Sequence, residues 1–476
     1  MPVITASIDP VTRIEGHLKV DVKVDTVNGV QQVVDVHAIG TLFRGFEKIL
    51  EHRDPRDAPI VTSRICGVCP TSHAMAAVLS LDQACGVAAP EPARLMRNLV
   101  HGACYLESHI LHFYLLSLPD YIKGPSMAPW LPGWDPGLRL DRAAEGGFLG
   151  HYLAAIEVRR KAHEMGAIYG GKLPHTPAFI AGGITAVSSA DDKSQFGAYL
   201  DELIAFIEGS YIPDVERLAS LYPEYFSIGR GYGHLLSFGA YELNNAGTSK
   251  LFAPGRVVSG TPEVQAMNAS AISEHIVHSW YHPSTNDVHP AVGDTIPQYP
   301  KLEAYSWLKS PRYAGLPYEC GPLARMAVNG DYSHGVSVMD RHRARAWEAR
   351  KLALAMKDWL SQLAVDVSAY TPAAIPTTGA GMGLTEAPRG ALGHWLSIAS
   401  QKIAHYQVIT PTCWNISPRD SAHQMGPLEK ALMGTPVANA DQPIEVLRVI
   451  HSVDPCLDCA THVMRAEPTK NRREEI

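Results

Sequence analysis

Two Cys-x-x-Cys pairs are the residues of this chain most able to do chemistry. They account for four of the eight cysteines and lie near opposite ends of the 476 residues, as Cys66 with Cys69 and Cys456 with Cys459. A histidine follows each pair three or four residues on. Thiolates prefer soft or borderline metals to magnesium or calcium. The pairs therefore predict one four-thiolate metal site, provided that the fold brings the chain ends together.

The spacing by itself leaves other interpretations open. A single C-x-x-C is also typical of thioredoxin-like redox chemistry or of half a zinc site. Zinc ribbons place their pairs ~15 to 20 residues apart, so a structural or interaction protein built on four-thiolate zinc would need an unusual long-range site. Buried thiols that pack as small hydrophobic side chains are another interpretation. The other cysteines are single and form no iron–sulfur ligand run: Cys85, Cys104, Cys320 and Cys413.

Motifs around both pairs resemble the metal-binding signatures of the large subunit of nickel–iron hydrogenases. They are Arg64 to Cys69 with His73, and Asp454 to Cys459 with His462. Further matching segments occur in the family's order along the chain: Asp9 to His17, Phe43 to Glu47, Glu386 to Gly390, Thr410 to Asn415 and Ser417 to Asp420. Together these segments are far more specific than either cysteine pair.

The resemblance implies a nickel–iron centre on the four cysteines. Cys66 and Cys456 would be terminal nickel ligands, and Cys69 and Cys459 would bridge nickel and iron. A bound divalent metal deprotonates a coordinating thiol, and bridging thiolates keep two metals close together. The implied activity is the reversible heterolytic cleavage of dihydrogen, in the uptake direction.

The family's iron carries cyanide and carbon monoxide ligands. The residues that match those around these ligands are Pro388, Arg389, Pro411 and Thr412. Among them, Arg389 and Thr412 are expected to donate hydrogen bonds to the cyanide nitrogens.

Heterolytic cleavage releases a proton, so a base must stand beside the metals. The resemblance offers the thiolate of Cys456 and the guanidinium of Arg389. Because arginine normally stays protonated, we expect Cys456 to accept the proton and Arg389 to organise the charges. Glu15 matches the family's first proton-relay carboxylate, and the alternative for Glu15 is a structural salt bridge with Arg13 or Lys19.

Four further residues receive roles from the resemblance. Glu47 and His462 match a magnesium-type site near the C-terminus, where few protein ligands and several waters suit magnesium, although iron is an alternative. His73 is expected between the centre and the partner's nearest cluster, and its alternative is a satisfied core histidine. Asp454 is expected to form a canopy over the metals with Arg389. Where many relatives carry an aspartate in that canopy, this chain has Ser108, which cannot carry the charge.

The resemblance also implies processing and partners. Nickel-insertion factors would load the metal, and a maturation endopeptidase would then cut after His462. Residues 463–476 would be a removable extension, and residues 1–462 one integrated catalytic domain. The obligate partner would be a small subunit carrying iron–sulfur clusters, since no cysteine run here can hold them. A dihydrogen sensor is the alternative within the family, but sensors usually lack a cleaved extension.

Three segments resemble the respiratory uptake group more than other groups of the family: Tyr305 to Tyr313, Gly426 to Glu429, and His451 to Asp454. In that group the complex is exported to the periplasm on the small subunit's signal and is linked to the membrane through its partner and a cytochrome. This chain shows no basic region followed by an apolar region at its N-terminus, which fits that route and fits a cytoplasmic enzyme equally. No apolar run of 18 residues is present either, so the protein is expected to be soluble by itself.

The elements that must position these residues are mainly helical. Alternating residues from 17 to 40, with Asn28-Gly29 between them, predict a β-hairpin. Apolar residues repeat at helical spacing in 92–113, 196–207 and 347–363, and residues 124–147 and 253–322 are predicted as long ordered loops. The expected fold class is α+β, mainly α, with a core of long helices and small antiparallel sheets near the N-terminus.

Composition agrees with a folded, partner-bound protein. Only 19% of residues are charged, below the ~25% of typical soluble proteins, so much of the chain must be buried in a core or against a partner. The formal charge is -7. A nucleic-acid partner is not expected, because such proteins need a basic patch to displace counterions.

Overall fold

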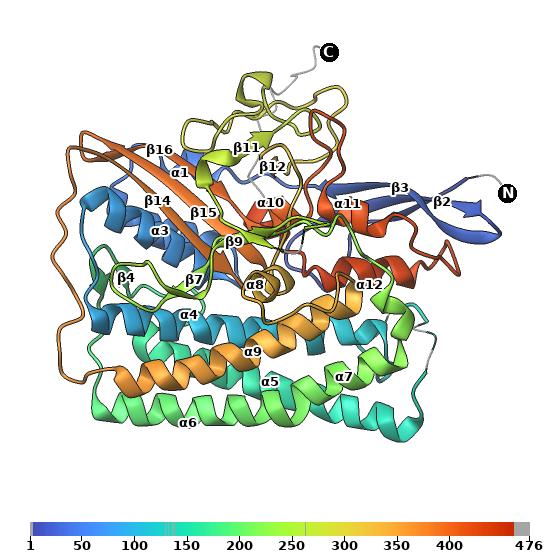
Figure 1. The fold of residues 1–476 in the computed structure, drawn as a ribbon, viewed down its shortest axis with the longest axis horizontal. Helices are drawn as coiled ribbons and strands as arrows, with labels where there is room; N and C mark the ends of the chain where they lie inside the picture. Colours follow the sequence, from blue (N-terminus) through green and yellow to red (C-terminus); the bar gives the residue numbers. More distant parts are fainter. Residues whose placement is uncertain are drawn as a thin grey trace, which may run out of the picture.

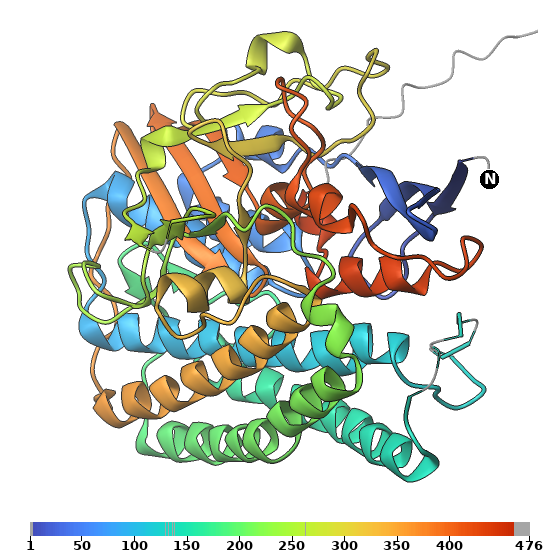
Figure 2. The same cartoon turned by 45° about the vertical axis from the view of Figure 1, so that its right-hand side comes forward.

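Helices and sheets occupy different layers of the molecule. The computed structural model describes residues 3–128, 130–131, 133–135, 137, 139–261 and 263–460, with the side chains of 142–144 and 459–460 left out. Long helices form one layer, and the sheets and loops lie against it (Figure 1). Figure 2 shows the same two layers from a second direction.

Helix α4 (Glu91–Leu111) is the centre of the helical layer. It packs on α5 (Arg142–Gly170), on α9 (Val338–Gln362) and on α3 (Pro70–Cys85). Every residue of α4 from Ala93 onward is buried. This helix therefore has neighbours all round, and the polar side chains along it must find partners inside the protein.

Two further helices complete this layer. Helix α6 (Ala190–Phe206) packs on α5 and α9, and α7 (Ile212–Leu221) packs on α9 (Figure 1). The predicted helices over 92–113, 196–207 and 347–363 are confirmed as α4, α6 and α9. Helix α9 begins earlier than its apolar pattern indicated, because the Ser337 side chain caps it by accepting from the Asp340 amide. No helix in the described part of the chain is both long and apolar enough to cross a bilayer.

The predicted N-terminal hairpin is confirmed. Strands β2 (Leu18–Val27) and β3 (Val30–Gly40) pair antiparallel, and β1 (Ile4–Ile8) adds to the edge of β2. Asn28 and Gly29 both have positive φ, as a two-residue type I′ turn requires. The mainly helical α+β class is also confirmed.

A second antiparallel sheet was not anticipated. It consists of β14 (Thr378–Ala387), β15 (Gly390–Ala399) and β16 (Lys402–Ile409). Strand β15 is buried on both faces, so its sequence lacks the alternation of a half-exposed strand. Glycines interrupt β14 and obscure its pattern in the same way.

Three glycines on one face of β14 let helix α3 lie directly on the strand. Gly379, Gly381 and Gly383 alternate along it and so share a face. A Cβ on Gly381 would lie 1.9 Å from the Ser80 carbonyl oxygen, and one on Gly383 would lie 1.9 Å from that of Ala76. Because α3 begins directly after Cys69, this close approach helps to set the position of the first cysteine pair.

The remaining elements are short. The region 253–322, predicted as a loop, contains several two- to four-residue strands, and α5 begins inside the predicted loop 124–147. The short helices are α1 (Phe46–Leu50), α2 (Ala58–Thr62), α8 (Pro322–Val328), α10 (Pro411–Asn415), α11 (Pro427–Leu432) and α12 (Ile444–Ser452). The short strands are β4 (Phe179–Ile180), β5 (Gly183–Ile184), β6 (Leu235–Ser237), β7 (Ala240–Glu242), β8 (Lys250–Phe252), β9 (Gly255–Val257), β10 (Val264–Gln265), β11 (Ile272–His275), β12 (Ser310–Tyr313) and β13 (Glu319–Cys320).

We predict that Gly381→Ala destabilises the protein by about 1–3 kcal/mol, because the new methyl group must push α3 off the strand. Thermal unfolding of the purified protein measures the loss. Gly209→Ala is the matched control, since a Cβ at Gly209 meets nothing within 4 Å. Equal stability of the two variants would contradict the proposed close packing.

Candidate metal centre

The structure brings the two cysteine pairs together. The Sγ atoms of Cys66, Cys69 and Cys456 all lie within 4.8 Å of one another, and all three residues are buried. Within the described ranges, this is the one group of three or more residues able to hold a metal ion. The Cys66 and Cys456 sulfurs are 3.2 Å apart, well beyond the ~2.05 Å of a disulfide bond. Cys459 belongs to the 3₁₀ turn Leu457–Ala460, but its side chain is not described.

Local backbone geometry positions the thiols of the first cysteine pair. Cys66 is extended after a 3₁₀ turn, and Cys69 caps the N-terminus of α3. The amides of Val68 and Cys69 both donate to the Cys66 sulfur, at 3.3 and 3.2 Å. Amide donors and a helix N-terminus stabilise negative charge on sulfur, so the turn favours the thiolate that a metal requires.

The N-terminal segment holds the second pair in place. Glu15 and Cys456 form a parallel β-bridge, in which the Glu15 amide donates to the Pro455 carbonyl at 3.4 Å and the Leu457 amide donates to the Glu15 carbonyl at 2.7 Å. Gly16 is required beside this bridge, since a Cβ there would lie 2.4 Å from the Asp458 amide nitrogen. Glu15 and Gly16 thus lie directly against the second pair.

Arg44 joins the two pairs directly. Its Nη2 donates to the backbone carbonyl of Ile65, next to Cys66, and to that of Asp458, between the cysteines of the second pair. Its guanidinium also lies over the Phe46 ring. One side chain therefore contacts the backbone of both metal-binding segments.

Arg389 is the buried cation of the site. Its Nε donates to Asp454 Oδ1 at 3.0 Å, and its Nη1 donates to Ser108 Oγ at 3.4 Å. Burial alone would lower the pKa of Arg389, but the charge of Asp454 and of the cysteine thiols raises it well above its usual range. Asp454 has a positive φ of 57°, so its backbone is strained where it meets the second pair.

The three residues of the predicted canopy thus lie in contact, Arg389 with both Asp454 and Ser108. Nη2 of Arg389 lies 3.0 Å from Asp454 Oδ1 but makes no hydrogen bond of acceptable geometry to any described residue. Buried donors are nearly always hydrogen-bonded. This donor is therefore available to a bound group.

The other predicted neighbours of the iron ligands lie on two short segments. Thr412 Oγ1, in α10, accepts from the Cys456 amide at 3.1 Å. A hydroxyl also carries one donor hydrogen, so Thr412 too can donate to a bound group. Pro411 is in the first turn of α10. Pro388, in the turn between β14 and β15, offers its carbonyl to Arg325 at 2.8 Å.

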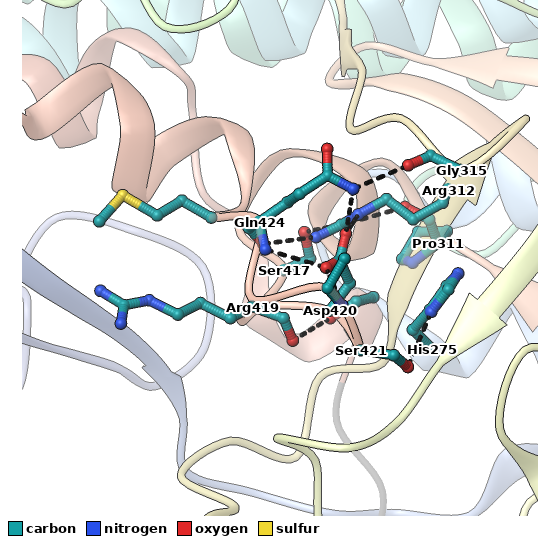
Figure 3. A network of polar contacts seen from close by, with 12 residues as sticks. His275, Pro311, Arg312, Gly315, Ser417, Arg419, Asp420, Ser421 and Gln424 are labelled. Atoms are coloured by element: carbon teal, nitrogen blue, oxygen red, sulfur yellow. Dashed lines mark hydrogen bonds and ion pairs between the residues drawn. The ribbon is translucent and has the colours of Figure 1, made fainter.

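A buried ion pair fixes the chain that follows α10. Arg312 on β12 donates from Nε to Asp420 Oδ2 at 2.7 Å, and both side chains are essentially inaccessible (Figure 3). Arg312 also donates to Ser417 Oγ at 3.1 Å and to the Gln424 carbonyl at 3.2 Å. Removing one partner of such a pair is costly because the other charge stays buried. The network therefore anchors the segment that carries Thr412.

Glu15 is a carboxylate at the edge of the site. Its Oε1 accepts from the Gly67 amide at 3.3 Å. Burial, followed by the charges of Cys66 and Asp458, raises the pKa of Glu15 to about 7. The alternative salt bridges are absent from the described structure, since Arg13 pairs with Asp120 and Lys19 pairs with Asp21.

His73 begins a buried chain of hydrogen bonds. Its Nδ1 lies 3.2 Å from His394 Nε2, and His394 Nδ1 lies 2.7 Å from the Tyr406 hydroxyl. Burial lowers the pKa of His73 to about 4, so its imidazole is neutral near pH 7. Its Nε2 has no partner among the described residues.

Half of the predicted magnesium-type site is described. Glu47, in α1, is only 3% exposed, and its charge raises the pKa of neighbouring Tyr281 in addition to the larger effect of burial. Lys309 donates to Glu274 at 3.2 Å in the same region, and Glu47 helps to raise the pKa of Glu274. His462 lies outside the described residues, so its meeting with Glu47 stays a prediction.

Sequence reasoning missed several residues of the site. Arg44 belonged to a quoted motif but was given no role, and no local pattern connected it with both cysteine pairs. Asp458 could have been found, because a carboxylate inside a C-x-x-C pair must affect nearby acids. His394 and Tyr406 lie on β15 and β16, the sheet that the sequence pattern did not reveal.

Comparison with known proteins decides the family. The profile described as nickel-dependent hydrogenase matches residues 44–129 and 124–462, and a HoxL-like profile matches residues 5–35. This chain belongs to the nickel-dependent hydrogenase family. Its two cysteine pairs, Arg389 and the α10 segment all fall within the matched residues.

Similar proteins cover nearly the whole chain. The periplasmic [NiFeSe] hydrogenase large subunit of Desulfomicrobium baculatum is 40% identical, over 97% of this chain and 95% of that protein. The uptake hydrogenase large subunit of Bradyrhizobium diazoefficiens is 34% identical, over 96% and 95% of the two chains. The Ni-Fe-Se hydrogenase structure from D. vulgaris Hildenborough superposes with a TM-score of 0.94 at 40% identity, covering 97% of this chain and 100% of that one. All four metal-site positions are cysteine here.

The donor set fits a nickel–iron centre. The described thiols are buried and close together. Arg389 Nη2 makes no hydrogen bond to a described residue, and the Thr412 hydroxyl lies next to Cys456, whose amide donates to it. Soft sulfur ligands suit nickel and iron. The chain is thus the catalytic large subunit of a hydrogenase.

We predict that Arg44→Gln lowers the nickel and iron content of the purified hydrogenase. Losing hydrogen bonds from a charged donor costs about 1.5–3 kcal/mol, which corresponds to roughly tenfold or greater weakening of the joined segments. Elemental analysis measures the metals. Arg53→Gln is the control, because Arg53 also donates to a backbone carbonyl, that of Ile49, but is exposed. Full metal content in Arg44→Gln would refute the proposed role of Arg44.

Proposed function

We propose that this hydrogenase subunit oxidises dihydrogen at a nickel–iron centre held by Cys66, Cys69, Cys456 and Cys459. Cys66 and Cys456 would be terminal nickel ligands, and Cys69 and Cys459 would bridge to iron. The observation that carries the proposal is the meeting of three buried thiols from the two chain ends, within 4.8 Å, beside the buried guanidinium of Arg389.

The iron is proposed to carry cyanide and carbon monoxide. Arg389 would hold one cyanide nitrogen through Nη2, which makes no hydrogen bond to a described residue, and Thr412 would hold the other through its hydroxyl, beside Cys456. Pro388 and Pro411 flank these two residues in sequence and would contribute walls without further donors.

When bound, the centre supplies heterolytic cleavage of dihydrogen into protons and electrons. The chain's own residues then handle the proton. The Cys456 sulfur would accept it, since the Arg389 guanidinium holds its own protons firmly. Asp454 orients that guanidinium through the 3.0 Å hydrogen bond from Nε.

Glu15 would receive the proton next. Its backbone runs alongside Cys456 in the β-bridge, and its carboxylate reaches the amide of Gly67 within the first pair. A relay group works best when its pKa lies near the working pH, and the pKa of Glu15 is about 7. It can therefore take up and release a proton near neutrality.

We predict that Glu15→Gln keeps the metals but abolishes dihydrogen oxidation. Glutamine preserves the shape and the acceptor for Gly67 but cannot take up a proton. Hydrogen-dependent dye reduction, measured together with nickel and iron content, checks this. Lys19→Gln, a half-buried neighbour paired with Asp21, is the control. Normal turnover in Glu15→Gln would remove Glu15 from the relay.

Electrons would leave through an iron–sulfur small subunit, in an obligate heterodimer. The four remaining cysteines lie singly, so they offer no cluster site of their own.

His73 is proposed to lie between the centre and the partner's nearest cluster. A periplasmic enzyme linked to the membrane through its partner and a cytochrome is proposed; the relative named a periplasmic hydrogenase supports the compartment.

Glu47 and His462 are proposed to hold magnesium, or iron in its place, near the C-terminus. A buried carboxylate on α1 is a suitable oxygen ligand, and a backbone carbonyl and waters would take the remaining positions. This ion would tie the end of the mature chain to the region around Cys66.

Residues 463–476 are proposed to be removed by the maturation endopeptidase after nickel insertion, which leaves residues 1–462 as the integrated catalytic domain. We therefore predict that intact-mass spectrometry of active heterodimer shows a large subunit ending at His462. The unprocessed subunit from cells grown without nickel is the control, and it should retain the extension. Active protein ending at Ile476 would refute the cleavage.

We predict nickel and iron near one to one at the thiolate site, with infrared absorptions from cyanide and carbon monoxide. The partner's cluster iron is determined separately and subtracted. Cys456→Ser is the matched variant, and it should lose nickel and these absorptions together. Zinc alone at the four cysteines would overturn the proposed function in favour of a structural protein.

A further inference from the structure

Two histidines outside the metal centre face one another at a distance typical of metal ligands. His278 Nε2 lies 3.2 Å from His423 Nδ1, although the residues are 145 positions apart. Nitrogen ligands lie about 2.0–2.1 Å from zinc, so two neighbouring ligands on one ion are separated by roughly 3.0–3.4 Å. In this structure His423 Nδ1 donates a hydrogen bond to His278 Nε2, and the same separation of the two nitrogens suits two ligands of one cation.

The tautomer of His278 is already suited to binding. Its Nδ1 lies 3.0 Å from the Glu303 carbonyl oxygen, which can only accept, so Nδ1 carries the proton and donates. The neutral ring therefore has its lone pair on Nε2, which faces His423. Metal-binding histidines almost always donate their other ring N–H to such a carbonyl or carboxylate.

His423 is held by a rigid turn. Its φ is 59°, a strained value for histidine, and its amide donates to the Asp420 carbonyl at 3.0 Å. Asp420 Oδ1 accepts from the amides of Ala422 and Gln424, both at 2.9 Å, while Arg312 binds Oδ2. Figure 3 shows this turn packed against β12 and β11. The position of His423 is therefore set by the fold and does not rest on His278.

The side chains of His278 and His423 differ in their exposure to solvent. His278 is 7% exposed, whereas His423 is exposed, so an ion can approach from solvent and meet a fixed inner ligand. The neighbouring His275 has other partners: its Nδ1 lies 3.0 Å from Ser421 Oγ, and its Nε2 lies 3.3 Å from Asp287 Oδ1. No third described ligand lies within reach of the pair, so water would complete the coordination.

We propose that His278 and His423 form an accessory site for a divalent transition cation of the zinc, copper or nickel type. Imidazole suits these ions, whereas magnesium and calcium require oxygen ligands. On binding the ion, the imidazole of His423 would change tautomer: its proton would lie on Nε2 and its lone pair on Nδ1. Both imidazole rings stay neutral. The ion would then connect the Asp420–Gln424 turn to the segment that carries His278.

The test uses the complete, metal-loaded heterodimer and zinc as the probe. Equilibrium dialysis against micromolar zinc, followed by elemental analysis, should show one more zinc equivalent in wild type than in His423→Ala. His278→Gln should show the same loss, and either variant should bind this equivalent at least about tenfold more weakly. His275→Ala, on the same surface but outside the pair, should keep it.

A second measurement separates coordination from general surface binding. Bound zinc stabilises the folded form by mass action, so zinc should raise the unfolding temperature of wild type and His275→Ala but not of His423→Ala. Dihydrogen oxidation without zinc should be equal in wild type and His423→Ala. The same zinc content in wild type, His423→Ala and His278→Gln would overturn the site, as would equal loss in His275→Ala.

Discussion

The meeting of the two chain ends is the constraint on which the rest of the structure depends. Half of the proposed cysteine ligands come from each end, so the proposed centre requires Cys66 and Cys456 to be held side by side. Backbone contacts do this: the bridge between Glu15 and Cys456, and the Arg44 guanidinium on the carbonyls of Ile65 and Asp458. Backbone partners leave the sulfur atoms available for metal.

Several charged side chains are buried around the candidate metal centre. The fold tolerates them because each charge has an oppositely charged partner. Arg389 lies among Asp454 and the thiols, and Arg312 lies on Asp420, each with almost no exposure. An isolated buried charge would be far too costly, whereas a paired and hydrogen-bonded one is tolerated. The atoms that remain without protein partners, such as Arg389 Nη2, then mark where a bound group belongs.

Much of the site could be predicted from sequence, but unevenly. The cysteine pairs were found from their spacing, whereas Glu15, Arg389 and Thr412 were found because their segments resemble motifs of the family. Arg44 and His394 were not found, since their roles arise from contacts with segments that lie far away in sequence. The β14–β16 sheet was not predicted because its strands lack the alternation of apolar and polar residues that indicates a strand. In β14 this is due to the glycines against which α3 packs, and in β15 it is due to burial on both faces.

The sequence by itself determined the residue types and the local elements: four thiols in two pairs, the hairpin at Asn28-Gly29, and the long helices. These depend on neighbours within a few residues, which a linear pattern records. Only the tertiary structure decided which groups share one space, such as Glu15 beside Cys456 or His278 facing His423. Such meetings follow from packing between distant segments, because burial and hydrogen bonding act through space and leave no spacing rule along the chain.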